Sequence, residues 1–213
     1  MKKNLCFSLS LLGAFGVWTL LLRTADVRAI GPQNTSVGLA TLNQAFHVLT
    51  GVHWSLYRLT DWLSLIPLGI VASFALLGLC QWIRRKKLQK VDPDLMVLGG
   101  FYLTVIAIYL LFEKAVVNYR PVLVQGALEA SYPSSTTVLV LCVMLTALLQ
   151  AKRRLKSRRI LLIIRTLILC FTLFMVVGRL LSGVHWLTDI LGGVLLSGSL
   201  LGLYTAAEAK FTP

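Results

Sequence analysis

Six long apolar runs constrain this chain more than any other feature of its sequence. The runs cover residues 4–22, 62–82, 94–113, 134–151, 160–178 and 187–207. A helix needs about 20 apolar residues to cross the hydrocarbon core of a bilayer. Charged residues make up only 14% of the chain, against about 25% in a soluble domain. The runs therefore predict an integral membrane protein with six transmembrane helices in one membrane domain, residues 1–213.

The first run begins like a secretory signal peptide, because two lysines follow the initial methionine. Its apolar stretch, however, is nearly twice as long as the apolar region of a signal peptide. The segment Val27-Arg28-Ala29 that follows is also a poor cleavage site, since an arginine stands beside the small residue. We therefore expect this run to be retained as the first transmembrane helix.

The basic residues are distributed unevenly between the two sides that six spans define. The chain has 21 Lys and Arg against 8 Asp and Glu, a formal net charge of +13. One side has 14 of the cations, mostly within residues 84–90 and 152–159, and the other side has six. The positive-inside rule then predicts that both termini are cytoplasmic. Because topology accounts for the charge, we expect the membrane as a partner of the basic runs and no nucleic acid.

The connection between the first two runs, residues 23–61, is long and mildly amphipathic. It carries Phe46, Trp54 and Tyr57, and Trp62 follows directly. Aromatic residues on an amphipathic segment are typical of helices that lie in the membrane interface. We expect this loop to form an interfacial helix on the outer leaflet.

Unusual polar residues gather at the outer ends of the last four spans. They are Lys114, Arg120, the segment 131–137, Arg179, His185 and Asp189. A single arginine or lysine at a helix end is explained by its charged head reaching out to water. A group drawn from three separate segments is not explained in this way. These residues are therefore the candidate functional site.

His185 and Asp189 are four residues apart, one helical turn, so they share a face of a helix that begins near His185. A carboxylate in that position accepts a hydrogen bond from one imidazole nitrogen and leaves the other nitrogen free to attack. The alternative is that Asp189 only stabilises the start of the helix through its dipole.

The segment Pro133-Ser134-Ser135-Thr136-Thr137 leads directly into the fourth span and is typical of a helix start. A helix N-terminus offers free N–H groups and a positive dipole end, which suit a phosphate group. Capping explains one hydroxyl residue, whereas four in succession indicate an additional role. Arginines such as Arg120 and Arg179 bind phosphate oxygens with two parallel hydrogen bonds.

These motifs together resemble the type 2 phosphatidic acid phosphatase superfamily, membrane lipid phosphatases related to vanadium haloperoxidases. The resemblance is carried by Lys114 with Arg120-Pro121, by Pro133-Ser134, and most specifically by Arg179, His185 and Asp189 at the family's spacing. It implies an all-α bundle and a phosphohistidine mechanism that uses no metal or other cofactor. It also implies the role of each site residue. His185 is the expected nucleophile, Asp189 orients it, and the phosphate ligands are Arg120, Arg179, Lys114 and Ser134, to which we add Ser135 and Thr136.

The first departure from the family's pattern concerns Lys114. Five residues separate it from Arg120, whereas the family usually has six. On a continuous helix, a step of six residues places the two side chains about 120° apart. Lys114 therefore joins the site only if the helix ends before Arg120, and Pro121 favours such an end because it disfavours helix at the preceding residue.

The second departure is Thr136, which stands where the family has a histidine that protonates the leaving alcohol. General acid catalysis contributes roughly 10²–10⁴-fold, and a threonine hydroxyl is too weak an acid to supply it. Three explanations stay open. The leaving group needs no proton, as with a lipid diphosphate; His47 or His53 of the outer loop supplies one; or the chain is a reduced or engineered inactive relative.

His53 attracts attention because Gly51-Val52-His53-Trp54 repeats the four residues Gly183-Val184-His185-Trp186. The next acidic residue after His53 is Asp61, eight positions on, so this pair does not reproduce the spacing of His185 and Asp189. The sequence therefore favours an interfacial anchoring role for His53 over a catalytic one.

The function we expect is hydrolysis of the terminal phosphate of a lipid phosphate or diphosphate, such as undecaprenyl diphosphate. We expect the site at the outer leaflet of a bacterial-type plasma membrane. The alternative is a lipid-phosphate binding or transport protein that keeps the anion pocket without full catalysis. An intramembrane serine protease that uses Ser134 with His185 leaves both arginines unexplained.

Overall fold

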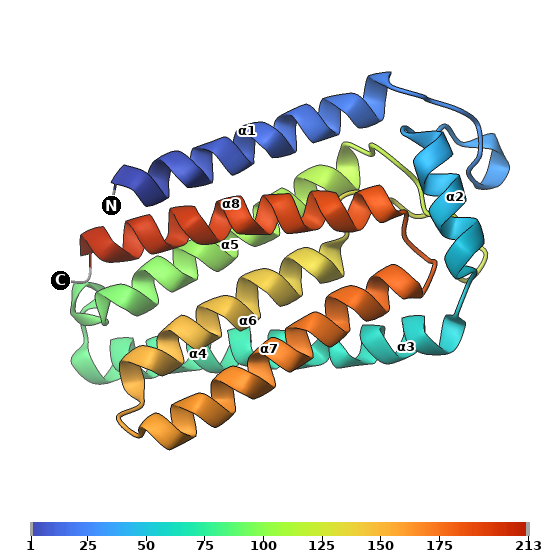
Figure 1. Ribbon diagram of the computed structural model, residues 1–213. Helices are drawn as coiled ribbons and strands as arrows, with labels where there is room; N and C mark the ends of the chain where they lie inside the picture. Colours follow the sequence, from blue (N-terminus) through green and yellow to red (C-terminus); the bar gives the residue numbers. More distant parts are fainter. Residues whose placement is uncertain (1, 212–213) are drawn as a thin grey trace.

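The computed structural model describes residues 2–211, and the regular elements in this range are helical (Figure 1). Apolar composition and length set the long helices, because no water is available inside a bilayer to satisfy an open backbone. Their order along the chain is α1 Lys2–Thr24, α2 Ala40–Thr50, α3 Trp54–Leu63, α4 Leu65–Arg85, α5 Pro93–Lys114, α6 Ser135–Arg154, α7 Arg158–Leu181 and α8 Leu187–Phe211. Two short 3₁₀ helices, Pro32–Asn34 and Leu88–Lys90, lie in the connections.

Six segments in this range are long and apolar enough to cross a membrane, with mean hydropathies of 1.6–2.8. The chain is thus a multi-pass membrane protein, and five of the predicted spans coincide with helices to within four residues at each end. The described ends of the chain, α1 and α8, lie side by side at one end of the bundle (Figure 1). This is the arrangement that an even number of spans requires.

The second span differs from its prediction. The sequence predicts that it begins at residue 62, whereas the helical segment extends over Trp54–Arg85, with α3 and α4 separated only by Ser64. Residues 54–61 of the loop 23–61 therefore belong to a segment that is long and apolar enough to cross a membrane. Its helix α2 runs across the end of the bundle, whereas α3 continues the line of α4 (Figure 1). The sequence does not indicate this extension of the helical segment, because the charged residues Arg58 and Asp61 lie in α3 and lower its apolar character.

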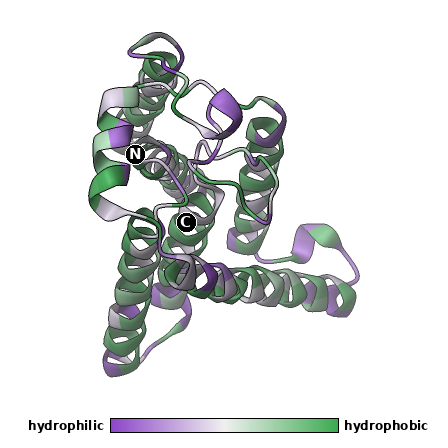
Figure 2. Cartoon of the chain, turned by 90° about the vertical axis from the view of Figure 1, so that its right-hand side faces the viewer, coloured by the Kyte–Doolittle hydropathy of each residue, from purple (hydrophilic) through white to green (hydrophobic). Residues whose placement is uncertain are grey.

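α6 and α8 form the centre of the bundle. In the apolar window of α6 61% of the residues are buried and in that of α8 44%, against 28% or less in the other spans. Large apolar side chains such as Leu103, Leu167 and Leu173 are exposed on the outer helices, as expected for a surface that contacts lipid. Viewed from the end that carries α2, hydrophilic residues gather in the connecting loops and at helix ends (Figure 2).

Close contact between α1 and α8 depends on a glycine. A Cβ atom added at Gly202 would lie 1.9 Å from Ser8 Oγ, so only glycine admits the neighbouring helix at this distance. Small residues at crossings of this kind are typical of membrane helices. At the other end of α1, Trp18 Nε1 donates to the Thr188 carbonyl oxygen at 3.2 Å. α1 therefore supports α8 along its length, including the first turn that carries Asp189.

Candidate active site

The candidate site lies at the end of the bundle opposite the described chain ends. α5 and α7 end there, and α6 and α8 begin there (Figure 1). The segment 115–134 brings Arg120 to this end, and the turn of residues 182–186 brings His185. Because neighbouring helices run in opposite directions, the motifs that contain Arg120, Ser134 and His185 all lie at this end of the bundle.

Arg120 and His185 are in direct contact. Arg120 Nη1 lies 2.9 Å from His185 Nε2, and both residues are buried. A guanidinium group has only donors, so Nε2 is the acceptor in this hydrogen bond and carries a lone pair. The proton of the neutral ring is then on Nδ1. This is the tautomer that nucleophilic attack by Nε2 requires.

Asp189 lies on the other side of the imidazole. Its Oδ2 is 3.7 Å from His185 Nδ1, one helical turn away as predicted, which is beyond hydrogen-bond distance. The same oxygen accepts a hydrogen bond from the Trp186 backbone N–H at 2.9 Å. An acidic residue in the first helical turn that bonds back in this way caps the helix. Asp189 therefore caps α8 and faces the imidazole at the same time.

Burial and the positive charges of Arg120 and Arg179 hold the pKa of His185 well below its usual range. The imidazole is therefore neutral at pH 7. A neutral ring with its free lone pair on Nε2 is a competent nucleophile.

Arg179 is almost fully buried, with 2% of its surface exposed, and α3 holds it. Its Nη1 donates to the Tyr57 carbonyl oxygen and to Thr60 Oγ1, both at 3.2 Å. Its Nη2 donates to Asp61 Oδ1 at 3.4 Å. Among the described residues, Nε has no hydrogen-bond partner. The structure thus keeps one donor of a buried guanidinium unused next to the histidine site.

The hydroxyl residues at the start of α6 divide into two groups. Ser134 is the N-cap: its Oγ accepts from the Thr137 backbone N–H at 3.4 Å and from Thr137 Oγ1 at 3.0 Å. Its own backbone N–H donates to the Asp189 carbonyl oxygen at 3.1 Å. Ser135 and Thr136 instead line a neighbouring cavity. The first turn of α6 therefore joins the histidine site to this cavity.

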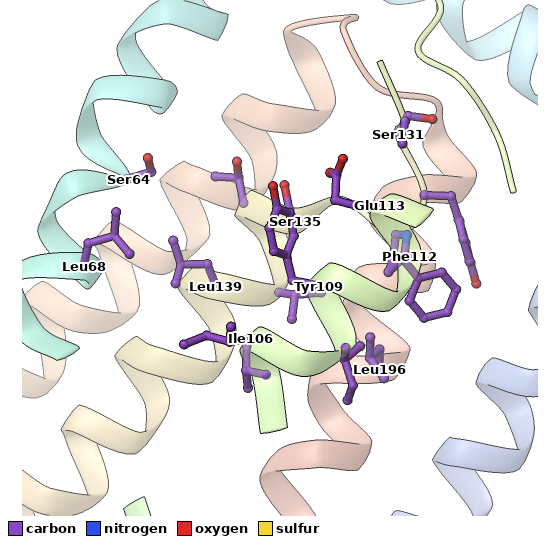
Figure 3. Close-up of a pocket in the computed structure, with 17 residues that line it drawn as sticks. Ser64, Leu68, Ile106, Tyr109, Phe112, Glu113, Ser131, Ser135, Leu139 and Leu196 are labelled. Carbon is purple, nitrogen blue, oxygen red and sulfur yellow. The ribbon is translucent and has the colours of Figure 1, made fainter. Parts of the chain in front are cut away.

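The cavity is a groove of about 370 Å³ between α4, α5 and α6 (Figure 3). Most of its lining is apolar, including Leu68, Ile106 and Leu139. Glu113 and Ser131 provide polar groups beside Ser135 and Thr136 (Figure 3). The groove thus combines an apolar wall with a polar end at the motif residues.

Lys114 is the predicted ligand that the structure does not bring to the others. α5 ends at Lys114, so the condition that the helix stops before Arg120 is met. The side chain is nevertheless exposed at the helix end. Arg120 instead has an acidic neighbour, since its Nε lies 3.0 Å from Glu129 Oε2. A role for Lys114 in phosphate binding remains a prediction.

The two other histidines have structural contacts. His53 Nε2 lies 2.9 Å from the Thr50 carbonyl oxygen. The ring of His47 packs against Trp186, with ring centroids 5.5 Å apart, and burial lowers its pKa. A neutral His47 is a poor proton donor.

The repeated Gly-Val-His-Trp segments form two turns that lie against each other. Gly51 and Gly183 both have positive φ, +66° and +67°. The His53 backbone N–H donates to the Ser182 carbonyl oxygen at 2.9 Å. A Cβ atom added at Gly183 would lie 1.8 Å from the Gly51 carbonyl oxygen. The first turn therefore supports the second, which carries His185.

Two supporting contacts have no signal in the sequence. Asn43 of α2 is buried, accepts from the Thr188 backbone N–H at 3.2 Å and donates to Thr188 Oγ1 at 3.0 Å. Trp186 Nε1 donates to the Tyr119 carbonyl oxygen at 2.8 Å and so ties the histidine turn to the loop of Arg120. Their partners are 145 and 67 residues away along the chain, which no local pattern reveals.

Comparison with known proteins identifies a family and a similar fold. The family model of the PAP2 superfamily matches residues 80–213. The chain belongs to the PAP2 superfamily. A similar solved structure is the transmembrane PAP2-type phosphatidylglycerolphosphate phosphatase from Bacillus subtilis, with a TM-score of 0.65 and 17% identity over 96% of this chain and 97% of that chain. A search of curated proteins finds no match.

Thr136 and Glu113 both line the groove. Six residues separate Glu113 from Arg120 along the chain. The groove beside the site therefore carries a hydroxyl group and a carboxyl group from these two positions.

Gly183→Ala tests the packing of the two turns, with Gly126→Ala as the matched control. Both glycines have positive φ, +67° and +81°, but only Gly183 has atoms close to an added Cβ. An alanine in this region of φ costs roughly 1–2 kcal/mol at either position, and overpacking adds about 1–3 kcal/mol at Gly183. We expect thermal unfolding of the purified protein to show a clearly larger loss for Gly183→Ala. Equal losses would contradict the packing role.

The protonation state of His185 is measurable by NMR on protein with ¹⁵N-labelled histidine, assigned with His185→Gln. We expect the ring to remain neutral at pH 6.5 and to become protonated only at lower pH, because burial and two arginines disfavour the cation. Arg120→Gln removes one of these charges and raises the pKa. A His185 resonance that titrates at or above pH 6.5 in the unmodified protein would contradict the assigned electrostatics.

Proposed function

We propose that this chain is a membrane lipid phosphatase that removes the terminal phosphate of a lipid phosphate or diphosphate through a phosphohistidine at His185. The observation that carries the proposal is the buried imidazole whose Nε2 lone pair is held by Arg120 at 2.9 Å. The unused Nε donor of Arg179 supports it, because a buried guanidinium with a free donor is suited to an anion. Membership of the PAP2 superfamily supports the same chemistry.

The reaction begins when the phosphate group enters between Arg120 and His185. Arg120 transfers its hydrogen bond from Nε2 to a phosphate oxygen, which frees the lone pair. Nε2 then attacks phosphorus in line, the bond from phosphorus to the lipid oxygen breaks, and the lipid leaves with the electron pair. The arginines stabilise the charge on the equatorial oxygens. As the ring becomes positive, Nδ1–H closes the 3.7 Å gap to Asp189.

Water completes the cycle. Its oxygen bonds to phosphorus, the bond from phosphorus to Nε2 breaks, and the ring nitrogen regains its lone pair. Inorganic phosphate leaves with both protons of the water. Arg120 then returns to Nε2, which restores the resting contact.

The leaving group selects the substrate class. Thr136 supplies no acid at neutral pH, so an alkoxide leaving group is left without a proton. The leaving group of a lipid diphosphate is itself a phosphate and needs none. The apolar groove adjacent to Ser135 and Thr136 suits the first part of the lipid chain. We therefore propose a polyprenyl or similar lipid diphosphate as the preferred substrate.

The distribution of basic residues supports a site on the outer face of a bacterial-type plasma membrane. The sparse side of the chain, with six cations, is the side of the site. A cysteine introduced at Gly126, in a variant without the four native cysteines, is expected to react with a membrane-impermeant maleimide on intact cells. Protection on intact cells and reaction only after lysis would reverse the assignment.

Thr136 also favours a second candidate function, a lipid-phosphate binding or transport protein that keeps the anion site without turnover. Such a protein binds lipid phosphates at Arg120 and Arg179 and forms no covalent phosphate. Phosphate release therefore distinguishes the two candidates.

Phosphate release by the purified protein tests the proposal. We expect a higher rate on lipid diphosphates than on monophosphates of the same chain. His185→Ala is expected to reduce release to background, whereas the control His53→Ala retains it, because the His53 side chain bonds to the Thr50 carbonyl oxygen in its own turn and alanine keeps the backbone N–H that contacts Ser182. Equal rates on both lipid classes would contradict the substrate preference. Full activity of His185→Ala would contradict the mechanism.

Thr136→His tests whether the proton donor is the missing part. We expect a gain on lipid monophosphates of about 10²-fold or more, the usual contribution of a general acid, and little gain on diphosphates. Ser135→His is the matched control, since Ser135 lines the same groove one position earlier. An absent gain for Thr136→His in a folded protein would show that the acid does not limit the reaction.

A further inference from the structure

The ring of Tyr57 lies within reach of both buried arginines. The guanidinium carbon of Arg179 is 4.4 Å from the ring centroid, and that of Arg120 is 5.8 Å. Both distances are within the range of about 6 Å in which an aromatic ring attracts a cation. Tyr57 belongs to α3, which lies outside the residues 80–213 that the family model matches.

The two guanidinium groups repel each other because both carry a positive charge. A bound phosphate offsets this repulsion with its negative charge. Before the phosphate binds, however, another contact must hold the two guanidinium groups close together. Each arginine has one acidic neighbour of its own, Glu129 for Arg120 and Asp61 for Arg179. These carboxylates are partly exposed and bind one arginine each.

Tyr57 differs from these neighbours because it contacts both arginines. Its carbonyl oxygen also accepts from Arg179 Nη1 at 3.2 Å. The negative face of an aromatic ring stabilises a cation without occupying the N–H donors that a phosphate uses. A carboxylate, in contrast, accepts hydrogen bonds from those donors. The ring therefore lowers the repulsion and leaves N–H groups available.

We propose that Tyr57 is a positioning residue that holds Arg120 and Arg179 at the separation needed to bind one phosphate group together. This inference rests on the proposed function, since it assigns both arginines to the same anion. Tyr57 acts through the arginines and takes no part in the bond changes at phosphorus.

The test measures binding of inorganic vanadate, a phosphate analogue, to the purified full chain by calorimetry. Tyr57→Leu removes the aromatic face and is expected to weaken vanadate binding about 10-fold. Tyr57→Phe keeps the ring and is expected to stay within about 2-fold of the unmodified protein. Trp62→Leu is the matched control, because it removes an exposed aromatic side chain from the same helix. Thermal unfolding of each variant reports folding separately.

A replacement of the same shape covers the case in which Tyr57→Leu does not fold. Pentafluorophenylalanine at position 57 keeps the size of the ring but reverses the charge of its face, so weaker vanadate binding at an unchanged unfolding temperature is expected. Unchanged binding in Tyr57→Leu or in the fluorinated variant would overturn the proposal. An equal loss in Tyr57→Phe would overturn it as well.

Vanadate binding also separates this inference from the proposed function. An unmodified protein that binds vanadate but releases no phosphate from lipids contradicts the phosphatase, while the dependence of binding on Tyr57 still supports the positioning role. Active protein whose vanadate affinity and KM are unaffected by Tyr57→Leu contradicts the positioning role alone.

Discussion

The structure depends on keeping two positive guanidinium groups buried at one end of a membrane bundle. Burying a charge is costly unless it is paired and hydrogen-bonded. Arg120 is stabilised by Glu129 and the imidazole of His185. Arg179 is stabilised by the Tyr57 and Thr60 oxygens and by Asp61 of α3. These contacts tie α3, α7 and the loop after α5 together, so the anion site is also the point where the bundle end is assembled.

The spans were largely predictable, because an apolar run of about 20 residues has one stable arrangement in a bilayer. The exception is informative. Asp61 directly precedes the second apolar run in the sequence, and its partner Arg179 lies 118 residues further along the chain. No local pattern shows that this carboxylate is paired with a cation, so the sequence alone predicts a loop where the structure has α3.

The site was predictable to the extent that its spacing is local. The step from His185 to Asp189 is one helical turn, and the structure places the two side chains together. The contact of Arg120 with His185 could not be predicted from local spacing, because it depends on how four spans are arranged. Asn43 and Tyr57 were beyond prediction as site residues, since their contacts join elements that the sequence does not show to be neighbours.

The central claim is that Nε2 of His185 becomes covalently phosphorylated. Rapid quenching in alkali of the purified protein with a ³²P-labelled lipid diphosphate, labelled in the terminal phosphate, tests it most directly. The account predicts a label that is stable to alkali, is lost in acid, maps to the peptide containing His185 and is absent from His185→Gln. Lipid turnover with no protein-bound phosphate, or a label on another residue, would contradict it.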